Sequence, residues 1–120
     1  MTNILLLRID ERPFDVAAVA HIFSTQSGFR DVRFEEPGGA AVEADYTEPE
    51  DWTIVSLSEN PSRISLSGTS DAALRAALIL QTHLKVPLRI FDTNYSFDLM
   101  LQNYATVDEL RAAIESAQAS

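Results

Sequence analysis

Two histidines are the first residues that could supply acid–base or metal chemistry, and both fall on segments with helical periodicity. A helical zinc site needs two histidines four residues apart with a glutamate between them, and neither His21 nor His83 has such a neighbour. His21 lies off the apolar stripe that begins with Val16 and Val19, so we expect it to face solvent. His83 stands at the end of its helix, where the helix dipole favours a cation. The spacing predicts no metal site and no catalytic role for either histidine.

Carboxylates and hydroxyls are the remaining candidates for chemistry. Asp92 and Asp98 flank a turn and could act together as an acid–base pair, but Asp92 in Asp-Thr-Asn is typical of a side chain that bonds its own backbone. Asp98 has the outward position on an alternating segment, and Ser65 and Ser67 have no base nearby in the sequence. Glycine-rich phosphate loops and GxSxG are absent, and a chain without cysteine has no thiol nucleophile or cysteine-ligated zinc. We therefore expect no enzyme activity, no catalytic residue and no cofactor.

The distribution of charge is the most unusual feature of the sequence. The chain has 18 acidic and 9 basic residues, for a formal net charge of −9. The segment 34–62 contains eight of the acids and no lysine or arginine, whereas the rest of the chain has ten acids and nine bases. The overall balance argues against sequence-independent binding to nucleic acid, which needs basic residues to neutralise phosphates. Charge so localised creates a field that steers oppositely charged partners.

Aromatic residues lie in or beside the same acidic segment, and aromatics amid charge are frequent anchors of protein interfaces. Alternation places Val55 and Leu57 toward the core, which leaves Trp52 on the other face of its strand. The sequence predicts a partner-binding surface, with Tyr46 or Trp52 as its apolar anchor. The members of this surface are Glu35, Glu36, Glu43, Asp45, Tyr46, Glu48, Glu50, Asp51 and Trp52. Two alternatives stay open: an acidic surface that is only solvated, and a core position for Trp52.

Apolar periodicity divides the chain into ten elements in the order β-α-β-β-β-β-α-β-β-α. We expect strands over 3–9, 29–35, 40–46, 52–58, 63–67, 88–91 and 95–101, and helices over 14–27, 71–85 and 107–118. The expected helices are few, and apolar and polar residues alternate regularly along the expected strands. This pattern predicts an α+β fold, a two-layer sandwich with a mainly antiparallel sheet and helices on one face. The face that carries Glu43, Asp45 and Ile54 should then stay open. The length of 120 residues and the 46% hydrophobic content fit a single domain over 1–120.

Capping signals indicate where the three helices begin and end. Pro13 suits the first turn of the first helix, and Gly28 suits the left-handed position just past its end. Ser70 is the expected N-cap of the second helix. Thr106 and Glu109 form a capping box, which predicts the start of the third helix.

The chain resembles the small, acidic, cysteine-free immunity proteins that bacteria encode beside polymorphic or contact-dependent toxins. The resemblance rests on the acidic stretch 35–51 and on Pro87-Leu88-Arg89-Ile90-Phe91-Asp92, Tyr95-Ser96-Phe97-Asp98-Leu99 and Thr106-Val107-Asp108-Glu109-Leu110 near the end. Such families share no common functional residues, so the resemblance transfers none to this sequence. It implies an inhibitor that binds one cognate toxin in the cytoplasm of the producing cell, often a basic nuclease.

Two function hypotheses from different classes follow. The first is an immunity-type inhibitor that neutralises a cognate, basic toxin through its acidic surface, with carboxylates in the positions of nucleic-acid phosphates. The second is a small-molecule-binding regulatory domain or subunit, which predicts homodimers and a ligand-dependent rise in Tm. The apolar run 4–7 is too short for a signal peptide or a spanning helix. We therefore expect a cytoplasmic protein that binds neither membrane nor nucleic acid.

Overall fold

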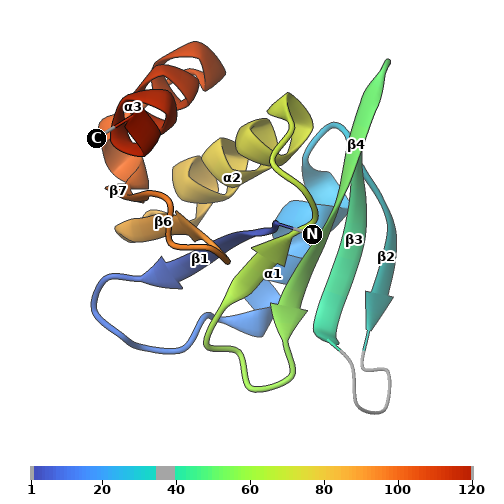
Figure 1. Cartoon of the computed structure of the whole chain (residues 1–120). Helices are drawn as coiled ribbons and strands as arrows, with labels where there is room; N and C mark the ends of the chain where they lie inside the picture. Colours follow the sequence, from blue (N-terminus) through green and yellow to red (C-terminus); the bar gives the residue numbers. More distant parts are fainter. Residues whose placement is uncertain (1, 35–39, 120) are drawn as a thin grey trace.

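The computed structural model describes residues 2–34 and 40–119, and it confirms the α+β fold and the predicted order of elements (Figure 1). The strands are β1 (Ile4–Arg8), β2 (Phe29–Phe34), β3 (Ala40–Glu48), β4 (Asp51–Ser58), β5 (Ile64–Leu66), β6 (Leu88–Asp92) and β7 (Asp98–Met100). The helices are α1 (Val16–Thr25), α2 (Asp71–Leu84) and α3 (Val107–Ala119), with a short 3-10 helix, η1 (Leu101–Asn103), before α3.

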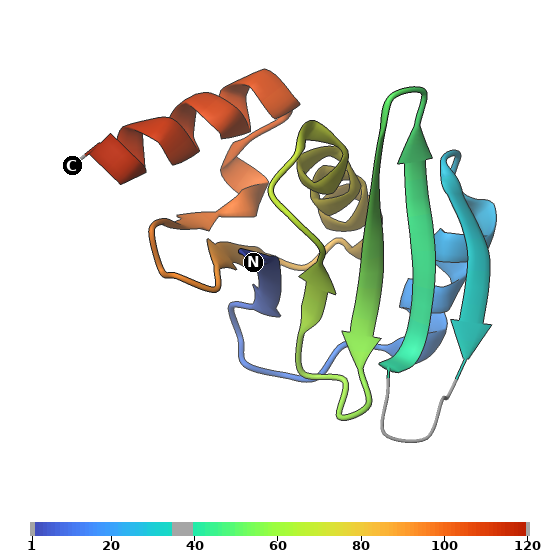
Figure 2. The same cartoon turned by 45° about the vertical axis from the view of Figure 1, so that its right-hand side comes forward.

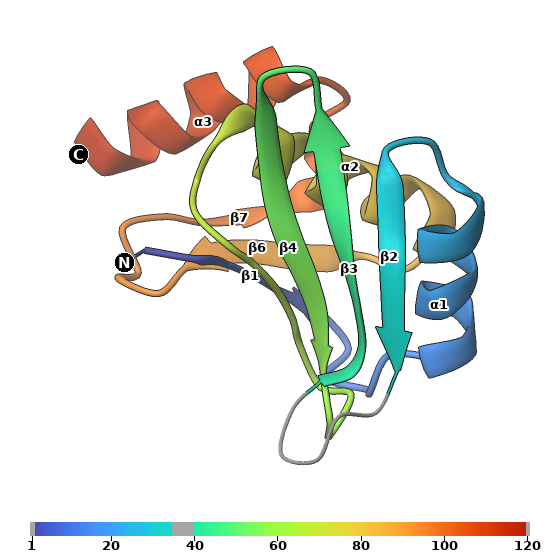
Figure 3. The same cartoon turned by 90° about the vertical axis from the view of Figure 1, so that its right-hand side faces the viewer.

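The described strands form one sheet in the order β2-β3-β4-β5-β1-β6-β7, in which every neighbouring pair is antiparallel. The apolar run at the start of the chain becomes the central strand β1, where Leu6 pairs with Ile64 on one side and Ile90 on the other. The sheet is strongly twisted. In Figure 3, β2, β3 and β4 stand upright, while β1 and β6 run across the view behind them.

One face of the sheet packs against α1 and α2, and the other face is open. Along β3 and β4 the side chains alternate: Val42 and Val55 are fully buried, whereas Glu43 and Ile54 are partly exposed on the other face. Helix α3 packs on α2 and contributes Leu110 to the same core. Figure 2 shows α2 and α3 on the same side of the sheet. This arrangement confirms the predicted two-layer sandwich with helices on one face.

The start of α1 differs from the prediction. Asp15, not a residue before Pro13, is its N-cap, because the Asp15 carboxylate accepts hydrogen bonds from the backbone N–H groups of Ala17 (3.0 Å) and Ala18 (3.3 Å). The helix ends at the C-cap Gln26, so Gly28 lies two residues beyond the cap, although it has the expected positive φ of 96°.

A β-bulge in β2 changes which side chains reach the open face. Arg30 pairs with Asp45 and Arg33 pairs with Glu43, with a register shift between them. In a regular strand, residues three apart point to opposite faces. The extra residue, with Asp31 in the left-handed region at φ 55°, brings both arginines to the same face. The bulge therefore interrupts the alternation of β2 between Arg30 and Arg33.

The last strand is also shorter than the predicted 95–101. Tyr95 has a positive φ of 53° in the turn after β6, and β7 pairs with β6 only over Asp98–Met100. Leu101 is buried and begins η1, where its carbonyl accepts the Tyr104 N–H at 3.2 Å. The predicted capping box of α3 is present: the Glu109 N–H donates to the Thr106 hydroxyl at 3.2 Å, and the Thr106 N–H donates to the Glu109 carboxylate at 3.1 Å.

Candidate functional site

The open face of β3 and β4 presents an exposed tryptophan. Trp52 is 60% exposed, whereas its neighbour Thr53 is fully buried. It lies opposite Thr47 on β3, and Ile54, two residues along β4, lies opposite Asp45 on the same face. The structure therefore excludes a core position for Trp52 and places an aromatic–aliphatic pair beside a carboxylate.

A hydrogen-bonded charge network borders this pair on β2, β3 and β4. The Arg33 guanidinium donates to Glu43 (Nη2 to Oε2, 2.8 Å) and to Asp45 (Nη2 to Oδ1, 3.1 Å). The Ser56 hydroxyl donates to the other Glu43 oxygen at 2.6 Å. The hydroxyl of Ser56, together with Arg33, lowers the pKa of Glu43, and the hydrogen bond to Glu43 raises the pKa of Arg33. The network contains the positive charge of Arg33 and the negative charges of Glu43 and Asp45, so its net charge is −1.

Tyr46, the other predicted anchor, is buried on the helix side of the sheet with 4% of its surface exposed. Its ring packs against Phe29, with ring centroids 4.9 Å apart, and its hydroxyl donates to Glu48 at 3.1 Å. Burial and the adjacent Glu48 carboxylate raise the pKa of Tyr46 to about 12. Because a buried ring cannot reach a partner, the assignment of Tyr46 as an anchor is corrected: it is a core residue.

Two predicted acids bind α2 instead of facing a partner. Glu48 forms an ion pair with Arg75 at 2.5 Å. Asp51 accepts the backbone N–H of Ala72 at 2.9 Å, in the first turn of α2, and that of Trp52 at 2.8 Å. Ser70 occupies the N-cap position but makes no capping hydrogen bond with its side chain. The cap of α2 is therefore a carboxylate from β4, which no local sequence signal indicates.

We expect Asp51→Ala to lower the free energy of unfolding by about 1–2 kcal/mol at neutral pH, as loss of a helix cap does. The N–H of Ala72 lowers the pKa of Asp51 below its ordinary value of 3.8. Because the pKa of Asp51 is lower in the folded state, its carboxylate stabilises the fold fully above pH 3.8. This stabilisation is lost as the pH falls through the folded-state pKa. Urea unfolding from pH 7 to pH 2 should show the two proteins converging in acid.

The control for this prediction is Glu50→Ala, which removes an equal charge one residue away. Glu50 is exposed at the β3–β4 turn and makes no hydrogen bond or ion pair with the described residues. Its replacement should change the free energy of unfolding by less than about 0.5 kcal/mol. Equal losses for the two variants would show that Asp51 acts by its charge alone and not as a cap.

The remaining members of the predicted surface are Glu35 and Glu36, which lie outside the described residues. Of those described, Glu43, Asp45 and Trp52 share the open face, whereas Glu48 and Asp51 bind α2 and Tyr46 is in the core. Arg33 is not among the residues predicted for this surface. The signal that could have found it is the alternation in the predicted strands 29–35 and 40–46, which turns both Arg33 and Glu43 away from the core.

The candidates for chemistry do not come together in space. Asp98 pairs with Arg89 on the open face at 2.5 Å, whereas Asp92 is 2% exposed and pairs in register with the core residue Ile4. The two carboxylates therefore lie on opposite faces of the sheet. His21 and His83 are exposed, as predicted for His21. Residues 2–34 and 40–119 contain no group of three histidines or carboxylates that could hold a metal ion.

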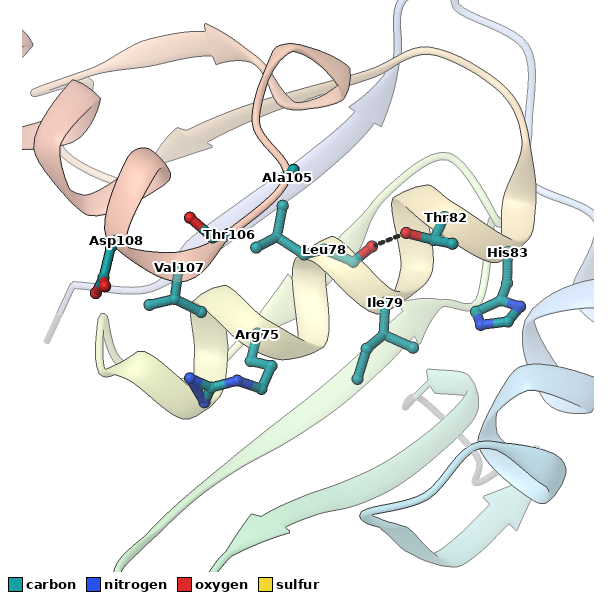
Figure 4. Close-up of a pocket in the computed structure, with 9 residues that line it drawn as sticks. All are labelled: Arg75, Leu78, Ile79, Thr82, His83, Ala105, Thr106, Val107 and Asp108. Carbon is teal, nitrogen blue, oxygen red and sulfur yellow. Dashed lines mark hydrogen bonds between the residues drawn. The ribbon is translucent and has the colours of Figure 1, made fainter.

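A groove of about 470 Å³ lies between α2 and the segment that leads into α3 (Figure 4). Leu78, Ile79 and Val107 line it, with the Thr82 hydroxyl bonded to the Leu78 carbonyl at 2.9 Å. His83 and Asp108 lie at opposite ends of the groove in Figure 4, and no acid–base pair forms there.

Comparison with models of protein families, with curated proteins and with solved structures finds no match for this chain. In the part of the chain that the structure describes, no helix has both the length and the apolar character that crossing a membrane requires. The function is therefore inferred from the geometry of the open face.

Proposed function

We propose that this protein is an immunity-type inhibitor, which binds a basic bacterial toxin in the cytoplasm through the open face of its sheet and performs no catalytic step of its own. The observation that carries this proposal is the exposure of Trp52, a residue that is 60% exposed beside Ile54 on a sheet face that none of the described helices covers. Tryptophan is enriched among the residues that dominate binding energy at protein interfaces.

The charge of the molecule supports a basic partner. The formal net charge is −9, whereas on the open face the Glu43–Arg33–Asp45 network beside Trp52 carries a net −1 that Arg30, opposite Asp45, offsets. A basic protein is attracted by the net charge of the whole molecule, because complementary fields accelerate encounter. A nuclease, which must be basic to bind phosphates, has this chemistry, and the bound inhibitor would cover its substrate channel.

The proposed function requires that a large toxin protein is encoded directly upstream, and the experiment that tests it is co-expression with the C-terminal domain of that protein. We expect that domain to stop cell growth alone and the co-expressed chain to restore growth. In vitro, the purified pair should form a complex, and emission from Trp52, the one tryptophan in the chain, should become protected from acrylamide quenching. An upstream metabolic enzyme, or growth arrest that the chain does not relieve, would contradict the proposal.

A pair of opposite charge changes tests whether the network steers the partner. Glu43→Gln combined with Asp45→Asn changes the net charge of the network from −1 to +1, and should slow association with a basic partner. Arg33→Gln changes it to −2 and should accelerate association. Each effect should be at most about fivefold per charge at low salt, because exposed pairs contribute about 0–1 kcal/mol. Stopped-flow quenching of Trp52 emission at two salt concentrations measures both rates.

High salt should abolish both differences, because screening removes interactions between exposed charges. Circular dichroism and urea unfolding must show that each variant is folded. Equal association rates for the three proteins at low salt would mean that the acids of this face are only solvated.

A further inference from the structure

A second concave site lies on the helix side of the sheet and is lined by residues of the N-terminal segment, the β6–β7 turn and α3. Figure 2 shows these three parts of the chain in the left-hand half of the view. The site has a volume of about 370 Å³. The side chains of Ile4, Leu74 and Ile114, all nearly fully buried, form its apolar floor. Asp92 and Arg111 contribute to its polar walls. This volume falls in the range of about 300–1,000 Å³ that small-molecule pockets have.

Asp92 places a carboxylate where the strand pattern requires an apolar residue. Leu88, Ile90 and Asp92 alternate toward the helices along β6, and Asp92 is 2% exposed. Its carboxylate accepts the Ser96 N–H at 2.6 Å and the Ser96 hydroxyl, and Ser96 accepts from Gln118 at 2.9 Å. These donors are neutral, and the described residues place no lysine, arginine or histidine nitrogen within ion-pair distance. A buried carboxylate with neutral partners gains from a cation, and each oxygen keeps a second lone pair for one.

Arg111 supplies the opposite charge on another wall of the same pocket. Its Nη2 donates to the Thr69 carbonyl at 2.9 Å and to Asp71 at 2.8 Å, which holds the guanidinium in place on α3. Its Nε and Nη1 make no hydrogen bond with the described residues. A guanidinium with unused donors in a fixed orientation is suited to a carboxylate.

We propose that this pocket binds an α-amino acid with an apolar side chain. The ammonium group of the ligand binds Asp92, its carboxylate binds Arg111, and its side chain lies on the floor of Ile4, Leu74 and Ile114. The site is separate from the open face, because Asp92 and Trp52 project from opposite faces of the sheet. Binding here is independent of the proposed inhibitor function.

Isothermal titration calorimetry with L-leucine and L-phenylalanine tests the proposal on the unaltered protein. Two truncated analogues of leucine separate the charge contacts: 3-methylbutylamine has no carboxylate, and 4-methylpentanoate has no ammonium group. We expect at least one amino acid to bind, and each analogue of leucine to bind about tenfold or more weakly than leucine. Equal affinity for the amine and the amino acid would overturn the assignment of Arg111. No heat with either amino acid at millimolar concentration would overturn the whole proposal.

Two variants locate the binding. Asp92→Asn keeps an oxygen acceptor for Ser96 and removes the charge, so affinity for the amino acid should fall about tenfold or more. The matched control, Asp98→Asn, removes a carboxylate on the opposite face and should leave the affinity unchanged. If Asp92→Asn fails to fold, the binding site is located by the changes in amide NMR chemical shift that the amino acid causes in the unaltered protein. Shifts confined to the residues around Asp92 and Arg111 support the site, and shifts elsewhere overturn it.

Discussion

If the proposed function holds, replacing Trp52 by alanine should weaken binding of the proposed toxin partner by about 2–4 kcal/mol, mainly through faster dissociation. The indole is 60% exposed in the free protein and would be buried with Ile54 on binding, so truncation removes the largest apolar contact of the face. Folding should change little, because a substitution at an exposed site usually shifts stability by no more than about 0.5 kcal/mol. Surface plasmon resonance with the partner immobilised gives both rate constants.

The matched control is Phe34→Ala. Phe34 is 58% exposed, almost the same as Trp52, but it pairs with the core residue Val42 and so lies on the helix side of the edge strand β2. Its loss should leave the dissociation rate unchanged. A Trp52→Ala protein that is folded and dissociates at the wild-type rate would remove the observation on which the proposed function rests.

The second large effect is expected from Gly28→Ala, which should lower the free energy of unfolding by about 2–5 kcal/mol. Gly28 has a φ of 96°, which a side chain disfavours by about 1–2 kcal/mol. An added Cβ would also lie 2.6 Å from Cε1 of Tyr46, and overpacking of this kind costs about 1–3 kcal/mol. The ring cannot move away cheaply, because it is buried against Phe29 and its hydroxyl is bonded to Glu48. Urea unfolding measures the loss.

Gly68→Ala separates the two causes of this loss. Gly68 also has a positive φ, of 74°, but an added Cβ there has no heavy atom within 4 Å. This variant should show only the backbone contribution of about 1–2 kcal/mol. Equal losses at the two glycines would mean that the contact with Tyr46 has no effect and that the packing around this ring is loose.

Local signals in the sequence were sufficient to predict the structure where one short segment contains both partners of an interaction. Thr106 and Glu109 cap α3 as the spacing predicts, because the hydroxyl, the carboxylate and the N–H groups that they bond lie within one turn. Alternation also located the open face, since Glu43 and Ile54 each lie directly between two buried residues of their strands. The Asp92 turn was predicted correctly as well, because its carboxylate bonds the Ser96 N–H only four residues away.

Predictions failed where the partner of a group comes from a distant part of the chain. Asp51 looked like one of several surface acids, but the structure brings it to the first turn of α2, where it accepts the Ala72 N–H. The cap at Ser70 that local preference indicated is not made by that side chain. The burial of Asp92 was also not visible, because α3, which packs over this end of the core, follows it by more than a dozen residues.

The sequence by itself determined the α+β class, the order of elements, the open face and the side of β4 on which Trp52 lies. These properties follow from periodicity, which depends on neighbouring residues alone. Only the tertiary structure decided which groups the carboxylates of the acidic segment 34–62 contact. Arg33 and Arg75 stand outside that segment, and the sheet and α2 bring them to Glu43, Asp45 and Glu48. Charge adds along a chain, but electrostatic energy depends on distance in space. Glu43, Asp45 and Glu48 of the acidic segment are therefore ion-paired in the structure, although the segment itself contains no basic residue.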